Sequence, residues 1–218
     1  MTAPASDNSE LRALASGRFR GSIDVPLQFF DAEAGRVARA CLAMAQRFNQ
    51  GGRLLAFGAG NAATDAQHIS VEFVHPVIMG KRALPAIALG TDIAATLGLA
   101  ASTGCFELYG RQIATLGRPA DIALGLDPHG RDVAVLAGLE SAVARGLLTI
   151  YLTTAAQARR ATAGADFCFG VPGDDPAVVQ ETHETLYHVL WELVHVFFEH
   201  KQLLDTAAPP HVLMVNHG

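Results

Sequence analysis

Five short runs of apolar residues recur along the chain, and they constrain its fold more than any other feature. Each run is bounded by Gly, Pro or Asp, and stretches with helical periodicity separate most of them. Continuous apolar strands that alternate with helices are typical of a parallel sheet buried on both faces. We therefore predict an α/β fold, a three-layer α-β-α sandwich with a five-stranded parallel sheet. The predicted strands are Leu54–Phe57, Leu84–Leu89, Ile122–Leu126, Leu148–Leu152 and Phe167–Val171.

Helical periodicity appears between these strands and toward both ends of the chain. Apolar residues of 31–50 recur every three to four positions, Asp31 is in position to cap a helix, and two glycines follow as a stop. Residues 1–30 are less periodic and contain Pro26, so we predict an N-terminal arm there, a single domain over 31–205 and a C-terminal tail over 206–218. The predicted helices are Asp31–Gln50, Ala63–His75, Ile93–Ala101, Phe106–Leu116, Asp132–Arg145 and Ala177–Leu203.

Composition disfavours several classes of partner. No apolar run approaches the ~20 residues of a membrane-spanning helix, and a net charge of −5 offers no footprint for nucleic acid or anionic lipid. We predict a small-molecule ligand, with no nucleic acid and no membrane as partner. The first ten residues do not resemble a signal peptide, and the cysteines are odd in number and scattered (Cys41, Cys105 and Cys168), so we expect a cytoplasmic protein.

Two loops lie where a parallel sheet binds ligands. In open α/β sheets the ligand sits at the carboxyl ends of the strands. Residues Gly58–Asn61 follow the first predicted strand and Asp127–Gly130 follow the third. The first loop lacks the third glycine of a dinucleotide fingerprint, which disfavours a nicotinamide cofactor.

His68 and Glu72 lie four residues apart on a predicted helix, so they project from one face. Such a pair can hold a metal ion or can simply form a solvated polar face. Gln180 and His188 lie about 12 Å apart along their helix axis, so they converge only on an ion between them. Paired Glu-x-x-His motifs ending at His75 and His195 also match di-iron four-helix bundles, but the predicted strands argue against such a bundle.

The segment Gly58-Ala-Gly-Asn-Ala-Ala-Thr-Asp-Ala-Gln-His68 resembles the Gly-Asn-Gly-Gly-Ser-Ala-Ala-Asp-Ala-Gln-His segment of phosphoheptose isomerases. The match covers residues 30–200, in order and at the family's spacing. It continues through the following residues: Glu72, Leu84–Leu89, Thr91-Asp92, Arg111-Gln112, Gly117-Arg118, Val171-Pro172, Gln180-Glu181-x-His183 and His188. The chain is therefore similar to members of the sugar isomerase (SIS) family, which have a flavodoxin-like fold.

The resemblance implies a zinc ion, a reaction and an assembly. In the family, zinc is held by the positions matching His68, Glu72, Gln180 and His188, although nickel or iron also accept this ligand set. The implied reaction is aldose–ketose interconversion through an enediol, in which Glu72 and His188 move the proton. The implied assembly is a homotetramer that uses the N-terminal helix, and the high apolar content of the chain agrees with buried subunit interfaces.

The phosphate loop departs from the family pattern. The family's Ser-Thr-Ser-Gly-Asn-Ser becomes Asp127-Pro128-His129-Gly130-Arg131-Asp132, so four hydroxyl donors are lost and two carboxylates are gained. Other substitutions fall at Ala59 and Ala62, at His75-Pro76 and at Ala155–Gln157. We expect sedoheptulose 7-phosphate to bind poorly or not at all. Asp127 either faces the ligand or itself occupies the helix N-terminus in place of a phosphate.

Two functions follow from these observations. The leading hypothesis is a metal-dependent aldose–ketose isomerase whose substrate is a sugar or sugar derivative other than the usual sugar phosphate. We predict that Asn61, Asp92, Asp127 and His129 contact this substrate. The alternative is a non-catalytic SIS-fold binding or assembly protein with a structural zinc, since a relative of these isomerases binds a replication initiator. The retained ligand set, Gln180 above all, favours the enzyme.

Overall fold

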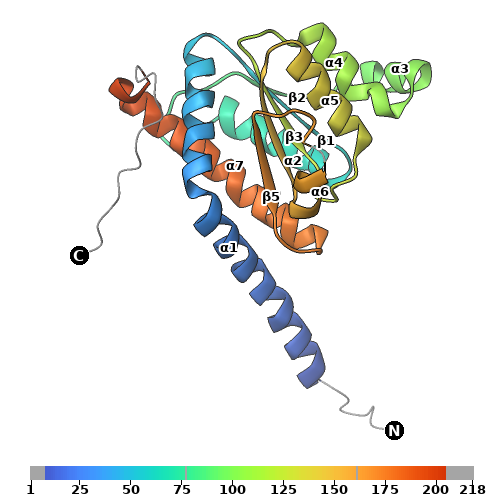
Figure 1. Cartoon of the computed structure of the whole chain (residues 1–218), viewed down its shortest axis with the longest axis vertical. Coiled ribbons are helices and arrows are strands. Elements are labelled where there is room, and N and C mark those ends of the chain that lie inside the picture. Colours follow the sequence, from blue (N-terminus) through green and yellow to red (C-terminus); the bar gives the residue numbers. More distant parts are fainter. Residues whose placement is uncertain (1–7, 77, 161, 205–218) are drawn as a thin grey trace.

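A five-stranded, entirely parallel sheet forms the centre of the molecule, in the strand order β2-β1-β3-β4-β5 (Figure 1). The computed structural model describes residues 8–76, 78–160 and 162–204. The sheet confirms the predicted fold class. The strands are β1 (Leu54–Gly58), β2 (Ala86–Ala88), β3 (Ile122–Leu126), β4 (Leu148–Thr154) and β5 (Phe167–Val171).

Helices cover both faces of this sheet and make three layers. Alternate strand residues face opposite sides: Leu54 and Ala56 pack with α1, α2 and α7, whereas Leu55 and Phe57 pack with α4 and α5. Every residue of β1 and β3 is buried, which is why both strands read as unbroken apolar runs. The helices are α1 (Asn8–Asn49), α2 (Asn61–Val74), α3 (Ile93–Thr103), η1 (Cys105–Glu107), α4 (Leu108–Leu116), α5 (Val133–Ala144), α6 (Ala155–Arg160), α7 (Pro176–Glu199) and η2 (Lys201–Leu203).

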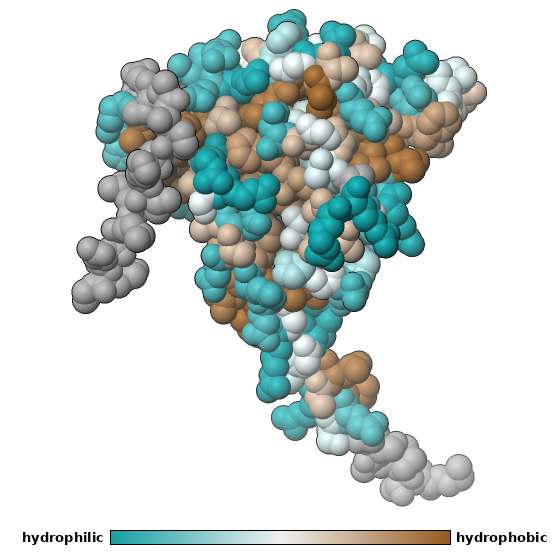
Figure 2. All heavy atoms as spheres, in the orientation of Figure 1, coloured by the Kyte–Doolittle hydropathy of each residue, from teal (hydrophilic) through white to brown (hydrophobic). Residues whose placement is uncertain are grey.

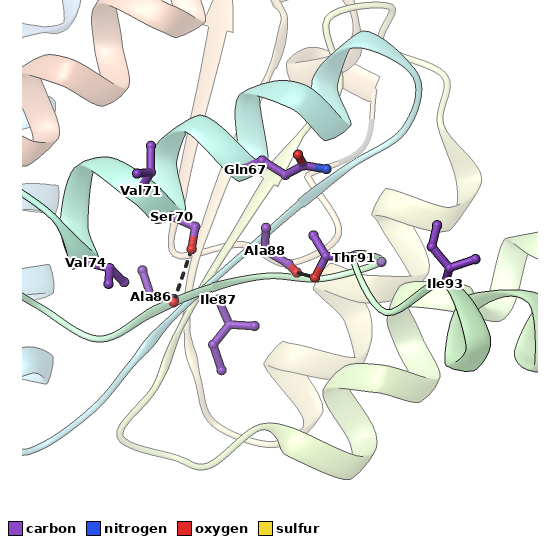
Figure 3. Close-up of a pocket in the computed structure, with 10 residues that line it drawn as sticks. Gln67, Ser70, Val71, Val74, Ala86, Ile87, Ala88, Thr91 and Ile93 are labelled. Carbon is purple, nitrogen blue, oxygen red and sulfur yellow. Dashed lines mark hydrogen bonds between the residues drawn. The ribbon is translucent and has the colours of Figure 1, made fainter.

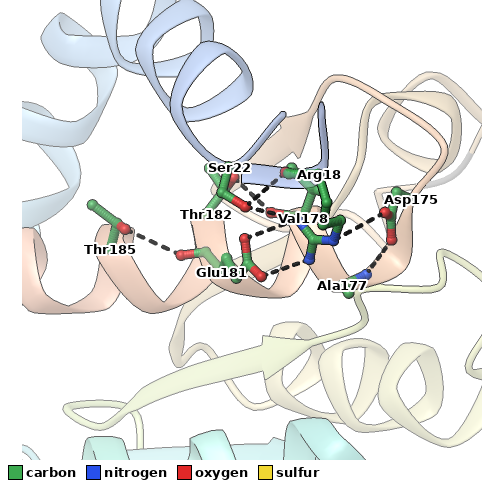
Figure 4. A network of polar contacts seen from close by, with 8 residues as sticks. All are labelled: Arg18, Ser22, Asp175, Ala177, Val178, Glu181, Thr182 and Thr185. Carbon is green, nitrogen blue, oxygen red and sulfur yellow. Dashed lines mark hydrogen bonds and ion pairs between the residues drawn. The ribbon is translucent and has the colours of Figure 1, made fainter. Parts of the chain in front are cut away.

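Helix α1 is much longer than predicted. It begins at Asn8 and not at Asp31, and it continues through Pro26 without ending. Contacts with the start of α7 support this additional segment, because Arg18 donates a hydrogen bond to Glu181 at 2.6 Å and lies 3.7 Å from Asp175 (Figure 4). The predicted helix start at Asp31 was therefore wrong, because packing of Val25, Phe29 and Phe30 against the core outweighs the local cost of Pro26. Residues 1–7 and the predicted tail 206–218 lie outside the described residues, and the division into arm, domain and tail stays a prediction.

Smaller differences occur at the strand ends. The edge strand β2 spans only Ala86–Ala88 of the predicted run. Helix α6 was not predicted, because it follows β4 directly and its six residues are too few to show a helical period. Helix α7 begins at Pro176, one residue before the predicted start, and Asp175 caps it through a hydrogen bond from the backbone of Ala177.

The β1–α2 turn brings α2 close to the sheet, and it requires glycine. A Cβ atom on Gly58 would lie 2.7 Å from the Cβ of Ala62, and Gly60 has a φ of +60°. The turn directs the N-terminus of α2 toward the carboxyl edge of the sheet, where the loop after β3 also lies. No helix within residues 8–76, 78–160 and 162–204 is long and apolar enough to cross a membrane.

Candidate metal centre and ligand cavity

Helices α2 and α7 bring three of the four predicted metal ligands together. One donor atom from each of His68, Glu72 and His188 lies within 4.8 Å of the others. The Nε2 atom of His68 is 3.4 Å from the Oε1 atom of Glu72. Zinc bonds of about 2.0–2.2 Å place tetrahedral ligand atoms roughly 3.4 Å apart. The donor types of all three residues and the His68–Glu72 separation therefore fit a zinc ion.

Gln180, the fourth predicted ligand, contacts a carboxylate on α2. Its Nε2 atom donates a hydrogen bond to Oδ2 of Asp65 at 2.9 Å. Burial raises the pKa of the Asp65 carboxyl, and the hydrogen bond from Gln180 offsets part of that effect. Since the amide nitrogen of Gln180 is engaged, its carbonyl oxygen is the atom left for a ligand role.

Two side chains that the sequence analysis missed join α7 to α2. The Tyr187 hydroxyl lies 2.9 Å from Nδ1 of His68, and Trp191 donates a hydrogen bond to the backbone carbonyl of Glu72 at 2.9 Å. Burial raises the pKa of Tyr187, and nearby carboxylates add to the increase, so its hydroxyl stays neutral. Gln180, Tyr187 and Trp191 recur at a helical spacing, which is the signal that could have identified this face of α7.

At the other loop, two carboxylates occupy the N-terminus of α5. Asp127 is buried, and its Oδ2 atom accepts hydrogen bonds from the backbone N–H of Asp132 at 3.0 Å and from the Tyr151 hydroxyl at 2.9 Å. The carboxylate of Asp132 in turn accepts from the backbone N–H groups of Ala134 and Val135. Through its Oδ2 atom Asp127 accepts from a backbone donor at the start of α5, as an anion would, which is one of the two arrangements considered for it.

A cavity of about 430 Å³ separates this loop from the β1–α2 turn. It is lined by Asn61, Asp127, His129, Arg131 and Asp132, among others, so three of the predicted substrate contacts meet around one space. The fourth, Asp92, does not line this cavity. It caps α3 by accepting a hydrogen bond from the backbone of Ala95 at 3.0 Å.

Asp92 lies instead near a second, shallower depression. This depression of about 630 Å³ runs between α2 and the edge strand β2 (Figure 3). Its lining is mainly apolar and includes Val71, Val74 and Ile87, whereas Ser70 is engaged in a hydrogen bond to the carbonyl of Ala86. The structure therefore separates Asp92 from the other three predicted contacts.

The family model of the SIS domain matches residues 19–154, most of the sheet and its helices. The chain belongs to the SIS domain family. It is 36% identical to a phosphoheptose isomerase of Thermodesulfovibrio yellowstonii over 83% of this chain and 90% of that protein. The solved phosphoheptose isomerase of Francisella tularensis superposes with a TM-score of 0.77 at 29% identity, covering 86% of this chain and 99% of that one. The enzyme from Neisseria gonorrhoeae gives a TM-score of 0.76 at 26% identity, covering 84% and 99%.

The di-iron alternative is wrong for this SIS domain. The five strands contradict a four-helix bundle. In addition, both ring nitrogens of buried His195 face backbone carbonyls, those of Trp191 and Arg82, at 2.8 and 2.9 Å. His75 caps the end of α2 and is exposed.

A further histidine, His183 on α7, is buried against the end of β4. His183 is fully buried, and its Nε2 atom lies 3.3 Å from the carbonyl oxygen of Thr153 at the end of β4. Burial lowers the pKa of His183 to about 4, although Thr153 and Asp127 counteract the shift. The side chain is therefore a neutral imidazole at physiological pH.

Proposed function

We propose that this SIS domain is a metal-dependent aldose–ketose isomerase, and that its substrate is a sugar or sugar derivative other than the usual sugar phosphate. The observation that carries the proposal is the convergence of His68, Glu72 and His188 from two helices. The names of its relatives, phosphoheptose isomerase, support the reaction class.

The metal that suits this site best is zinc, one ion per chain. We assign His68, Glu72, Gln180 and His188 as its ligands, with nickel or iron as alternatives that accept the same donors. Two imidazoles, one amide and one carboxylate leave the bound ion a net positive charge. When bound, the ion supplies a Lewis acid for a carbonyl or hydroxyl oxygen of the sugar.

The chain's own groups account for the proton transfer. Aldose–ketose interconversion moves a proton between adjacent carbons through an enediol, which requires a base and an acid beside the reacting carbons. Glu72 and His188 are the catalytic residues in this proposal. Both belong to the cluster: the Glu72 carboxylate is 3.4 Å from His68 and the His188 ring is 5.1 Å from the His68 ring.

The loop after β3 supports a substrate without phosphate. A phosphate at the α5 N-terminus would meet the carboxylates of Asp127 and Asp132, and the backbone donors there are already engaged. We propose that Asn61, Asp127 and His129 contact the uncharged part of the sugar across the 430 Å³ cavity. Asp92 is proposed to contact substrate from beside α3.

A panel of unphosphorylated sugars with added zinc tests the proposal. We expect turnover by the wild type and loss of turnover, by a factor of about 10²–10⁴, in Glu72→Gln. Glu192→Gln is the matched control, because Glu192 is an exposed carboxylate on α7. Loss of stability on chelation without any turnover would instead support the non-catalytic assembly protein with a structural zinc.

We also propose a homotetramer. The projecting end of α1 carries exposed hydrophobic side chains (Figure 2), and the apolar helix α3 has no buried residue. The exposed side chains on α1 are Leu11, Leu14, Phe19, Ile23 and Leu27. Exposed apolar surface of this kind marks subunit contacts. Light scattering at micromolar concentration should give about four times the chain mass, and a monomeric mass would refute the proposal.

A cytoplasmic location is the remaining proposal. All three cysteines are free thiols, and burial raises the pKa of Cys41 to about 12 and that of Cys168 to about 11. Thiols of this kind suit a reducing compartment. Cell fractionation would test the assignment.

A further inference from the structure

Tyr187 connects the two helices that carry the metal cluster. Its side chain is buried, with 2% of its surface exposed, and its hydroxyl lies 2.9 Å from Nδ1 of His68. The two rings also pack edge to face, with centroids 5.5 Å apart at 81°. Tyr187 immediately precedes His188 on α7, so one turn of that helix both supplies a cluster residue and contacts a second one.

No other side chain among the described residues provides this contact at Nδ1. The nearest carboxylate, Oε1 of Glu184, is 3.9 Å away and about half exposed, which is too far for a hydrogen bond. His68 itself is 37% exposed, so the Tyr187 hydroxyl is the contact that fixes the Nδ1 side of its ring. The phenol of Tyr187 therefore determines which ring nitrogen faces the cluster.

That nitrogen is Nε2, which lies 3.4 Å from the Glu72 carboxylate. A neutral imidazole ligates a metal through its unprotonated nitrogen, and the other nitrogen then carries the proton. A hydroxyl both donates and accepts. The Tyr187 hydroxyl can donate to Nδ1 when Nε2 carries the proton toward Glu72, and it can accept from Nδ1 when Nε2 binds the ion.

We propose that Tyr187 is a positioning residue of the metal site, which holds Nε2 of His68 toward Glu72 and His188 and supports either tautomer of that ring. The inference rests on the proposed metal site. It concerns how strongly the site binds metal and is independent of which sugar is turned over.

Zinc affinity, measured by competition with a chromogenic chelator, tests the proposal. We expect Tyr187→Phe to bind zinc 10- to 100-fold more weakly than the wild type, as is typical when a partner of a ligating histidine is lost. Tyr151→Phe is the matched control, because it removes another buried hydroxyl, on β4, that contacts Asp127 and not His68. Its zinc affinity should equal that of the wild type.

A His68→Ala variant separates this inference from the metal assignment. If Tyr187→Phe binds zinc like the wild type while His68→Ala does not, the positioning role is refuted and the metal site stands. If His68→Ala binds zinc like the wild type, the metal site itself is refuted, and the positioning role with it.

Nitrogen NMR of the wild-type histidine rings gives a readout that needs no variant to fold. In zinc-loaded protein we expect His68 to carry its proton on Nδ1, with that proton protected from exchange by Tyr187. A zinc-loaded His68 protonated on Nε2 would overturn the proposal.

Discussion

The cluster between α2 and α7 and the loop between β3 and α5 differ in what their polar groups can bind. At the α2–α7 contact, donor atoms from His68, Glu72 and His188 converge, and their spacing fits an ion. At the β3–α5 loop, the carboxylates of Asp127 and Asp132 already take the backbone donors of the helix N-terminus. The first arrangement offers donor atoms to a cation, whereas in the second the protein's own carboxylates accept from the backbone donors. If the proposed function is correct, the two regions of this fold separate the metal site from the choice of ligand.

Removing a ligand at the metal end should have the largest effect. Each of His68→Ala and His188→Ala deletes one of three converging donors, so metal content should fall from about one ion per chain to almost none. Elemental analysis of purified protein measures this. His75→Ala, an exposed histidine at the end of the same helix α2, should retain full metal content. Equal content in all four proteins would show that the cluster is not the metal site.

At the loop after β3, replacing the two carboxylates by hydroxyl side chains should allow phosphate to bind. Two like charges ~4 Å apart repel by roughly 4 kcal/mol at an effective dielectric of 20, about three orders of magnitude in affinity. The α5 N-terminus contributes only about 0.3–1 kcal/mol in favour of an anion. Calorimetry should show no binding of sedoheptulose 7-phosphate by the wild type and measurable binding by Asp127→Ser/Asp132→Ser.

Asp127→Asn serves as the control for charge in that experiment. It keeps the shape and an acceptor oxygen for Tyr151 and Asp132 but removes one negative charge, so it should give an intermediate affinity. Micromolar binding of the sugar phosphate by the wild type would contradict the assignment. It would favour ordinary phosphoheptose isomerase activity instead.

The smallest expected effect concerns His183, which is buried on α7 against the end of β4. The pKa of His183 is about 4 in the folded protein, against an ordinary pKa of 6.5. The unfolded chain therefore binds a proton that the folded chain does not, so stability falls as the pH decreases from 6.5 to 4. This group alone accounts for at most about 3 kcal/mol of that loss.

Urea unfolding at pH 7 and pH 4.5 measures this contribution. Between pH 7 and pH 4.5, the free energy of unfolding of His183→Gln should fall by about 2–3 kcal/mol less than that of the wild type. His200→Gln, which changes an exposed histidine at the end of α7, should behave like the wild type. An unchanged pH dependence in His183→Gln would show that the buried imidazole is not the group that titrates.

The sheet was predictable from the sequence because a strand that is buried on both faces is a continuous apolar run. The extent of α1 was not, since Pro26 signals a break locally and the packing that outweighs it, of Val25, Phe29 and Phe30 against the core, is a tertiary contact. Helix α6 left no trace because six residues span less than two turns.

The site was predictable only in part, for a related reason. The spacing of four residues predicted that His68 and Glu72 lie close together, whereas only the resemblance to a family predicted that His188 lies beside them. The contacts of Tyr187 with His68 and of Gln180 with Asp65 link residues more than a hundred positions apart. No local periodicity records such a pairing, and the packing angle of α2 on α7 determines it.

The hydrogen bond between Tyr151 and Asp127 couples the loop after β3 to the core of the sheet. Replacement of Asp127 by a short hydroxyl side chain would leave the buried Tyr151 hydroxyl without this acceptor, at a cost of about 1–3 kcal/mol. A substitution that changes the charge of the loop therefore also changes the stability of the protein.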